Sequence, residues 1–288
     1  MATIFITGCS VGIGYETALA FARAGHTVAA TMRNPQKAPQ LAEAAAREKL
    51  PMNVFAMDVD SDESVANGIA AVVKTLGPVD VLVNNAGIER SGTIEEMPLA
   101  EFRAVMETNY FGAIRCIQAV LPSMRQRRTG RIINVTSVAG QIAASPLSPY
   151  TASKHALEAL SEALAQEAKQ YGIRVTIVEP GIIDTAMARR VGTAGPKSMY
   201  RGQHRFAAMF AAILATPVPP TVVADRIVEI AGSDTWQLRH PVGAGAEEFL
   251  AWRNAMTDEQ WVDWGSMEDD PWYERVKADF HVDARAFA

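Results

Sequence analysis

Cysteine is scarce in this sequence. Only two cysteines occur among 288 residues, Cys9 and Cys116. So few exclude a disulfide-stapled scaffold and fit a reducing compartment. Cys9 lies in a glycine-rich turn and Cys116 in an apolar helical segment, so we interpret both as buried residues without a chemical role.

Long apolar runs and excess positive charge are also missing. No stretch approaches 18 uninterrupted apolar residues, and no signal-peptide pattern begins the chain. The formal net charge is -5, so no general basic surface is available for nucleic acid. We therefore expect a cytoplasmic protein with no membrane span and no nucleic-acid partner.

A regular alternation of strand and helix is what the sequence does contain. It begins at one glycine-rich turn, which is typical of a doubly wound parallel sheet. We predict a Rossmann-type α/β fold of about seven strands with helices on both faces. The predicted helices include residues 36–49, 61–76, 99–125 and 150–171. The predicted strands are residues 2–7, 27–31, 53–57, 79–83, 131–136 and 173–179, with a seventh near 236–240.

No repeat or low-complexity linker divides the chain. We predict one catalytic domain over residues 1–242 and a C-terminal helical extension over 243–288. The extension is too aromatic for a disordered acidic tail, so we expect it to pack on the body or on a partner subunit. Helix starts are predicted at Thr257 and Pro271. Its aromatic residues are Phe249, Trp252, Trp261, Trp264, Trp272 and Tyr273, of which Trp252 either reaches the pocket rim or packs.

The glycine-rich turn spans residues 7–14 and reads TGCSVGIG. Glycines let a backbone approach a pyrophosphate, and the next helix offers free N–H groups at the positive end of its dipole. The alternative is a tight turn that needs glycine only for positive φ. Its position between a strand and a helix favours phosphate binding.

Arg33 stands where an acidic residue, about 20 residues beyond the glycines, would bind the ribose 2′-hydroxyl of NAD. An arginine there pairs with a 2′-phosphate through its planar fork, unless it is a solvated surface residue. NADP(H) is therefore the favoured cofactor, and NAD(H) is the second choice. Asp58, after the third strand, either faces the adenine or is a turn or cap residue. The loop 84–87 supports the cofactor or forms a plain turn.

Tyr150 and Lys154 share one face of a helix, because they are four residues apart. An ammonium beside a phenol favours phenolate, so we expect a Tyr150 pKa lowered by about 1–3 units. The spacing alone is common on ordinary helices.

Ser137 directly follows the fifth predicted strand, a position that also suits a turn residue. Asn109 lies inside a predicted helix and marks either a kink or a polar relay.

Together these motifs resemble those of the short-chain dehydrogenases/reductases. TGxxxGxG, Asn84–Gly87, Asn109, Ser137, YxxxK and Pro180-Gly181 occur in order over residues 2–242. The resemblance implies a nicotinamide cofactor and a catalytic group of Asn109, Ser137, Tyr150 and Lys154. Ser137 would polarise a carbonyl oxygen and Tyr150 would protonate it. Lys154 would lower the Tyr150 pKa and hold the nicotinamide ribose, and Asn109 would support a water relay.

The same resemblance implies a cofactor site and an oligomer. Thr185 corresponds to a position that contacts the cofactor carboxamide in that family. Helices 99–125 and 150–171 resemble those that pair between subunits, so we expect a homodimer or homotetramer. No metal is expected. The predicted cofactor-binding residues are Gly8, Ser10, Gly12, Ile13, Gly14, Arg33, Asp58, Val59, Asn85, Ala86, Gly87, Tyr150, Lys154, Pro180, Gly181, Ile183 and Thr185.

A substrate cover is expected within residues 184–220, which combine Met and aromatic residues with Gly192, Gly195 and Pro196. Such residues form either a mobile lid or plain core. Gly92 and Ile142 are further candidates for the pocket wall. The predicted lid residues are Met187, Met199, Tyr200, Phe206, Met209, Phe210 and Ile213.

We predict an NADP(H)-dependent oxidoreductase that interconverts a carbonyl and a secondary alcohol on a bulky apolar substrate. An arginine after the second strand and a long segment after the seventh are similar to the pattern in family members that act on hydroxysteroids, retinoids and other bulky apolar carbonyl compounds. We include aromatic ketones among the expected substrates. The alternative within the family is a 3-oxoacyl-thioester reductase. The alternative of another class is a non-catalytic dinucleotide-sensing protein, which need not keep Ser137, Tyr150 and Lys154.

Overall fold

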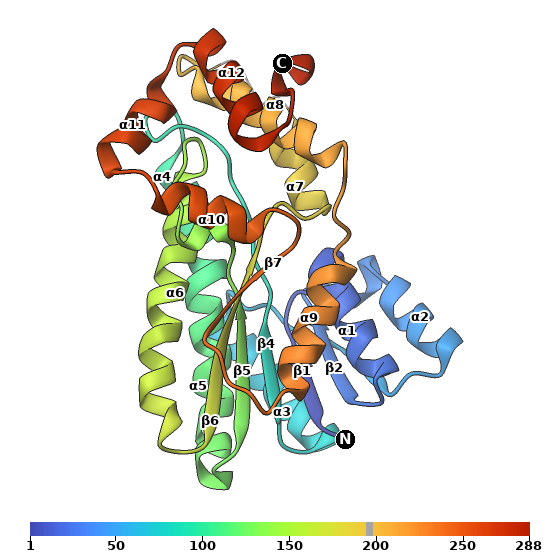
Figure 1. The fold of residues 1–288 in the computed structure, drawn as a ribbon. Coiled ribbons are helices and arrows are strands. Elements are labelled where there is room, and N and C mark those ends of the chain that lie inside the picture. The colour runs from blue at the N-terminus through green and yellow to red at the C-terminus, as the bar shows by residue number, and fades with distance from the viewer. Residues whose placement is uncertain (194–197) are drawn as a thin grey trace.

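The computed structural model describes residues 1–193 and 198–288 of the chain. Its strands form one sheet in the order β3-β2-β1-β4-β5-β6-β7, and all neighbouring strands are parallel. The order reverses between β1 and β4, as in a doubly wound sheet (Figure 1). The predicted fold class is confirmed. The strands are β1 (Thr3–Ile6), β2 (Thr27–Met32), β3 (Met52–Ala56), β4 (Val81–Asn84), β5 (Gly130–Val135), β6 (Ile173–Pro180) and β7 (Arg239–Val242).

Helices cover both faces of this sheet, because side chains of its apolar strands point alternately to either face. In β1, Ile4 and Ile6 enter one core and Phe5 enters the other. None of the helices that the structure describes is long and apolar enough to cross a membrane. The first core contains residues of α1 (Gly12–Arg23), α2 (Gln40–Glu48) and α9 (Thr221–Gly232), and the second those of α3 (Asp62–Leu76), α5 (Gly112–Arg127) and α6 (Ser148–Lys169).

Three predicted elements differ most from their predicted bounds. The helix predicted over 36–49 begins only at Gln40, because Pro39 disfavours helical backbone in the residue before it. The helix predicted over 99–125 is divided into α4 (Leu99–Met106), a π-helical turn (Glu107–Phe111) and α5. The seventh strand begins at Arg239, later than predicted. Trp236 lies before the strand, where its indole N–H donates to Val175 O at 2.9 Å.

A helical layer lies beyond the sheet, at the top of Figure 1. The capping box of Thr257 starts α11, as predicted, and Pro271 lies in the first turn of α12. Trp264 and Trp272 of the extension share one apolar core with Phe206 of α8. The aromatic extension therefore packs on the segment predicted to cover the substrate. The layer comprises α7 (Ala186–Val191), α8 (Gly202–Leu214), α10 (Ala246–Asn254), α11 (Asp258–Ser266), α12 (Asp269–Phe280) and a 3-10 turn (Ala284–Phe287).

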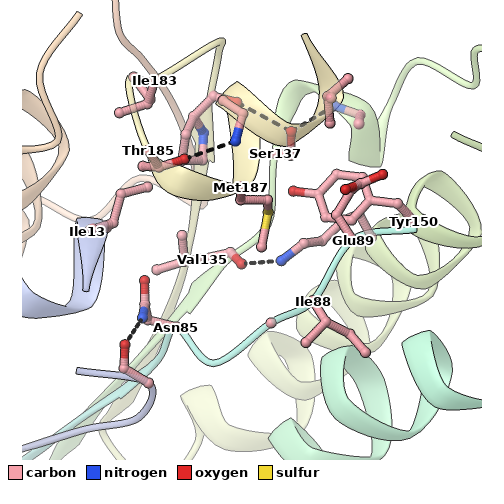
Figure 2. Close-up of a pocket in the computed structure, with 18 of the residues that line it drawn as sticks. Ile13, Asn85, Ile88, Glu89, Val135, Ser137, Tyr150, Ile183, Thr185 and Met187 are labelled. Atoms are coloured by element: carbon pink, nitrogen blue, oxygen red, sulfur yellow. Dashed lines mark hydrogen bonds between the residues drawn. The ribbon is translucent and has the colours of Figure 1, made fainter. Parts of the chain in front are cut away.

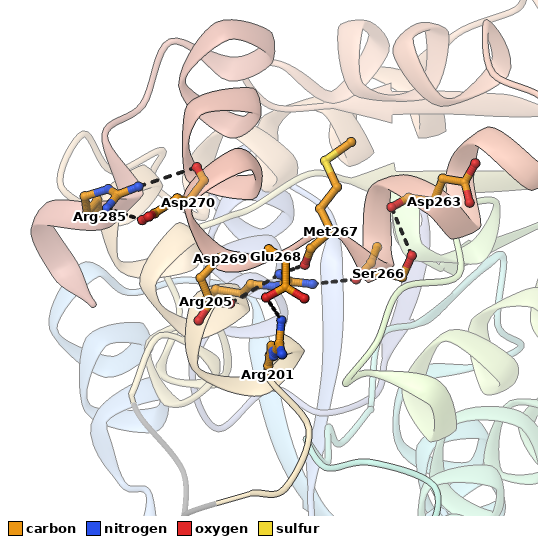
Figure 3. Close-up of polar contacts among 10 residues, drawn as sticks. Arg201, Arg205, Asp263, Ser266, Met267, Glu268, Asp269, Asp270 and Arg285 are labelled. Carbon is orange, nitrogen blue, oxygen red and sulfur yellow. Dashed lines mark hydrogen bonds and ion pairs between the residues drawn. The ribbon is translucent and has the colours of Figure 1, made fainter.

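Arg205 of α8 fastens this layer together. Its side chain is 4% exposed, and its guanidinium donates hydrogen bonds of 2.5 Å to Gly265 O and Met267 O (Figure 3). The same guanidinium lies 5.1 Å from the centroid of the Trp272 ring. A helix end leaves unpaired carbonyl groups, and here one arginine of α8 satisfies two carbonyls at the end of α11.

Candidate active site

The glycine-rich turn connects β1 to α1. Gly8 has φ +73°, and a Cβ there would come within 2.7 Å of Ala86 Cα. At Gly14, a Cβ would meet Gly8 O at 2.5 Å. Only glycine therefore lets the turn approach the neighbouring loop this closely. The N-cap residue of α1 is Val11, whose side chain makes no capping hydrogen bond. The first N–H groups of α1 are consequently free of a side-chain cap, which suits a pyrophosphate.

The loop Asn84–Gly87 is tied to this turn. Asn85 Nδ2 donates to Thr7 O at 2.9 Å and to Gly8 O at 3.1 Å, and the Thr7 hydroxyl accepts the backbone N–H groups of Asn85 and Ala86. Buried Asn84 donates to Asn134 Oδ1 at 2.8 Å, which joins β4 to β5. Each amide has a defined structural task at the carboxyl edge of the sheet. The loop is therefore more than a plain turn.

Arg33 lines a pocket that also includes residues of the glycine-rich turn and of the Asn84–Gly87 loop. It follows β2, is exposed, and lies near enough to Asp60 for its charge to lower the Asp60 pKa, which burial raises more strongly. Asp58 also lines the pocket, and its carboxylate accepts the Asp60 N–H at 3.2 Å. Asp58 therefore stabilises a turn and lines the pocket, while Ser61 caps α3. A contact of Asp58 with the adenine stays a prediction.

Ser137, Tyr150 and Lys154 line the same pocket, and Figure 2 labels Ser137 and Tyr150 among its lining residues. Ser137 follows β5, and its hydroxyl donates to Pro180 O at 3.3 Å. Tyr150 and Lys154 both project from α6, and Lys154 Nζ lies 5.6 Å from the centroid of the Tyr150 ring. The buried ammonium of Lys154 donates to Val135 O at 2.8 Å. The four-residue spacing therefore places both side chains on one face of α6, as predicted.

The expected lowering of the Tyr150 pKa is wrong for this structure. Burial raises the Tyr150 pKa to about 12, the nearby Ser137 hydroxyl lowers it, and the charge of Glu89 raises it further. Burial also lowers the Lys154 pKa to about 8, against the charge of Glu158. The low dielectric of the pocket disfavours both charged forms more than the lysine favours phenolate. The phenol therefore carries its proton at neutral pH.

Asn109 lies in the π-helical turn and is buried. Its Oδ1 accepts Ile88 N–H at 2.8 Å, and its Nδ2 donates at 2.9 Å to both Ile88 O and Ser153 Oγ. The amide therefore holds the loop after β4 against α6. It is absent from the residues that line the main pocket. The turn departs from regular helix as a kink would, and the water relay stays a prediction.

One cavity of about 350 Å³ joins the cofactor half of the site to an apolar half. Among the predicted cofactor-binding and catalytic residues, all but Gly14 and Asn109 line it. Thr185 also caps α7, where its hydroxyl accepts Ala188 N–H at 3.2 Å. The apolar half is lined by residues that include Ile142, Leu147, Met187, Val191, Phe206, Met209, Phe210 and Phe249.

Several expected wall residues lie elsewhere. Met199 and Tyr200 are exposed, and neither they nor Ile213 line the cavity. Gly92 turns its N–H to Pro146 O instead, and Trp252 stacks on Phe249 with ring centroids 5.5 Å apart. Gly195 and Pro196 are outside the described residues.

Sequence reasoning missed several lining residues, among them Glu89, Leu147 and Phe249. Leu147 belongs to no sequence motif that would have identified it as a pocket residue. Glu89 comes two residues after the Asn84–Gly87 loop, and that position at a strand end could have marked it. Phe249 was predicted only as part of the packed extension. Its contact with the pocket depends on how α10 turns back over the site.

Comparisons with known proteins identify the family of this chain. The family model described as short chain dehydrogenase matches residues 2–195. An uncharacterized oxidoreductase of Bacillus subtilis (strain 168), YusZ, is 35% identical over 91% of this chain and 95% of its own. Human retinol dehydrogenase 8 is 44% identical over 64% of this chain, but the match spans only 59% of its length.

A solved structure also superposes closely. A variant of actinorhodin polyketide ketoreductase with NADPH is 29% identical and has a TM-score of 0.76, with 85% of this chain and 97% of that one covered. Family, sequence relatives and fold therefore agree. The chain is an oxidoreductase and belongs to the short-chain dehydrogenase family.

Proposed function

We propose that this protein is an NADP(H)-dependent oxidoreductase that interconverts a carbonyl group and a secondary alcohol on a bulky apolar substrate. The convergence of Ser137, Tyr150 and Lys154 at the junction of the two halves of the cavity supports this proposal most strongly. Residues 1–242 would form the catalytic domain and 243–288 an extension that adds Phe249 to the substrate wall. A cytoplasmic homodimer or homotetramer remains the expected setting.

The residues of the turn fit a nicotinamide dinucleotide. The uncapped start of α1 and the close approach of Gly8 to Ala86 leave room and N–H groups for a pyrophosphate. When bound, the nicotinamide supplies the hydride in reduction or accepts it in oxidation. Arg33 would pair with a ribose 2′-phosphate, and Thr185 would hold the carboxamide.

The side chains of the protein would supply or accept the proton that accompanies hydride transfer. Tyr150 is protonated at neutral pH because its pKa is raised to about 12. In reduction, Ser137 would hold the substrate oxygen and Tyr150 would donate its proton to it, a role typically worth about 10²–10⁴-fold in rate. Lys154 would bind the nicotinamide ribose and replenish the proton, with Asn109 supporting the relay. In oxidation, the Tyr150 hydroxyl would accept the proton of the alcohol while it passes its own proton on toward Lys154 and the relay.

The apolar walls favour a bulky hydrocarbon body. Phe206, Met209, Phe210 and Phe249 close the substrate half, and apolar burial contributes roughly 25 cal/mol per Å². Retinoids, hydroxysteroids and aromatic ketones share this chemistry, and a retinol dehydrogenase is among the relatives.

A panel of carbonyl compounds tests the proposal. Consumption of NADPH is measured with aromatic ketones, a retinaldehyde, a ketosteroid and a 3-oxoacyl thioester. We expect turnover of at least one bulky apolar carbonyl compound. Preference for the thioester would favour the alternative reductase. Tight NADPH binding without turnover of any of them would favour a dinucleotide sensor.

A further inference from the structure

Glu89 is the acidic residue in the substrate half of the cavity. It lies in the loop after β4, is 6% exposed, and lines the pocket with Leu147, Phe206 and Met209. Carboxylates are almost never this buried unless they are paired. The partners of this carboxylate therefore decide what it does.

Those partners are few among the described residues. The Ser91 hydroxyl donates to Glu89 Oε1, and Oε2 accepts no hydrogen bond from them. The adjacent Arg90 is directed elsewhere, to Glu101 Oε2 at 2.6 Å and to the backbone oxygen of Glu89 at 2.8 Å. Within the part of the chain that the structure describes, no ion pair of 4.0 Å or less reaches the Glu89 carboxylate. One of its oxygens thus remains available in a space whose walls are mainly apolar but also include Arg190.

Its position is close to the reacting atoms. Figure 2 shows Glu89 beside Tyr150, and the charge of Glu89 is near enough to raise the Tyr150 pKa. Burial raises the pKa of Glu89 itself, while the charges of Arg190 and Arg90 lower it. Because Glu89 faces the cavity, a bulky ligand that fills the cavity removes water from the free oxygen of its carboxylate. A ligand that donates a hydrogen bond to this oxygen replaces that water, and a ligand without a donor leaves the oxygen unpaired.

We propose that Glu89 binds a hydrogen-bond donor of the substrate, a hydroxyl or ammonium group near the carbon that is oxidised or reduced. This inference rests on the proposed function and narrows the class of substrates that it allows. The preferred substrates are apolar in bulk, but they carry a second polar group that faces Glu89. The residue is therefore a determinant of specificity, because an analogue without the donor leaves the buried carboxyl unpaired.

Three ketones that differ by one group test this directly. Acetophenone, 2-hydroxyacetophenone and 2-aminoacetophenone are compared by kcat/KM in the wild type, Glu89→Gln and Glu89→Met. The wild type should prefer a ketone with a donor over acetophenone by about 10-fold or more. Glu89→Met should abolish that preference. The exposed Glu95→Gln serves as the matched control and should keep it.

The two variants distinguish the two donors. Glu89→Gln retains a neutral acceptor of similar shape, so a hydroxyl donor predicts that the preference for the hydroxyketone survives in it. If the donor is an ammonium group, Glu89→Gln should lose the preference for the aminoketone, as Glu89→Met does. A wild type without preference for either donor would overturn the proposal even if a variant fails to fold. Equal preference in the wild type and Glu89→Met would also overturn it.

The same comparison is made by binding alone. Calorimetry with oxidised cofactor gives the Kd of each ketone without turnover. If no ketone is reduced but the Kd preference depends on Glu89, the proposed reaction fails and the inference about Glu89 stands. If ketones are reduced and neither the Kd nor the kcat/KM preference depends on Glu89, the inference alone fails.

Discussion

Lys154 Nζ lies 5.6 Å from the centroid of the Tyr150 ring and donates its hydrogen bond to Val135 O rather than to the phenol. The two side chains share a helix face, yet burial has the larger effect on both. The Tyr150 pKa is raised to about 12 and the Lys154 pKa is lowered to about 8. The pair is therefore a neutral phenol beside an amine that titrates close to physiological pH.

Lys154 makes stability depend on alkaline pH. Its pKa is about 8 in the folded protein against an ordinary 10.5, so the unfolded chain binds more protons between these values. The free energy of unfolding then gains a contribution as pH rises from 8 to 10.5. Lys154→Met removes this gain, so urea unfolding should show the wild type becoming relatively more stable across the window. A difference that is constant with pH would contradict this assignment.

Glu179 predicts the opposite dependence at lower pH. Burial raises its pKa from 4.5 to about 7, although Gln141 donates to one oxygen; the other has no partner among the described residues. The folded state therefore binds the extra proton, and stability falls as pH rises from 4.5 to about 7.

Glu179→Gln should abolish that loss. The variant should be more stable than the wild type above pH 7, by at most about 3 kcal/mol, and the difference should disappear toward pH 4.5. Exposed Glu167→Gln is the control, and it should show no such trend. Thermal unfolding as a function of pH measures both variants. Greater stability of Glu179→Gln that is the same at every pH would refute the linkage.

The hydrogen bonds of Arg205 lead us to expect that the C-terminal extension stabilises α8, which covers the pocket. Arg205→Leu leaves Gly265 O and Met267 O without their donor and should cost about 1–3 kcal/mol. Arg201→Leu is the matched control on the same segment; its ion pair with Glu268 is exposed and worth about 0–1 kcal/mol. Hydrogen exchange should increase in both α8 and α11 of the first variant. Equal effects of the two substitutions would contradict this role of Arg205.

Arg33 predicts the choice of cofactor. Arg33→Ala should lower kcat/KM for NADPH by about 10–100-fold, since a hydrogen bond to a charged group is worth about 1.5–3 kcal/mol. The value for NADH should change little. Arg47→Ala, exposed on α2, should alter neither. Equal use of NADPH and NADH by the wild type would disprove the assignment of Arg33 to the 2′-phosphate.

Much of this site follows from local sequence. A glycine turn, polar strand ends and a tyrosine four residues before a lysine each depend on short-range geometry, and the parallel sheet brings its carboxyl ends to one edge. Gly8, Asn85, Ser137 and Tyr150 could therefore be placed before any coordinates.

What could not be predicted depends on burial and on long-range packing. The direction of the Tyr150 pKa shift reflects the enclosure of the phenol, which no spacing encodes. The contact of Arg205 with Gly265 joins residues 60 apart, and Phe249 reaches the pocket only because α10 returns over it. The strand-end position of Glu89 could mark it as a residue of the site, but only the folded cavity shows that its carboxylate is buried.

The proton role of Tyr150 is the central claim, and Tyr150→Phe tests it most directly. The substitution removes one oxygen and keeps the ring, and Tyr171→Phe, outside the pocket, is the matched control. The measurement is the single-turnover rate of ketone reduction with saturating NADPH, beside the Kd of NADPH. The account predicts a rate loss of about 10²–10⁴-fold with an unchanged Kd. A rate within a few-fold of wild type, with NADPH bound normally, would contradict it.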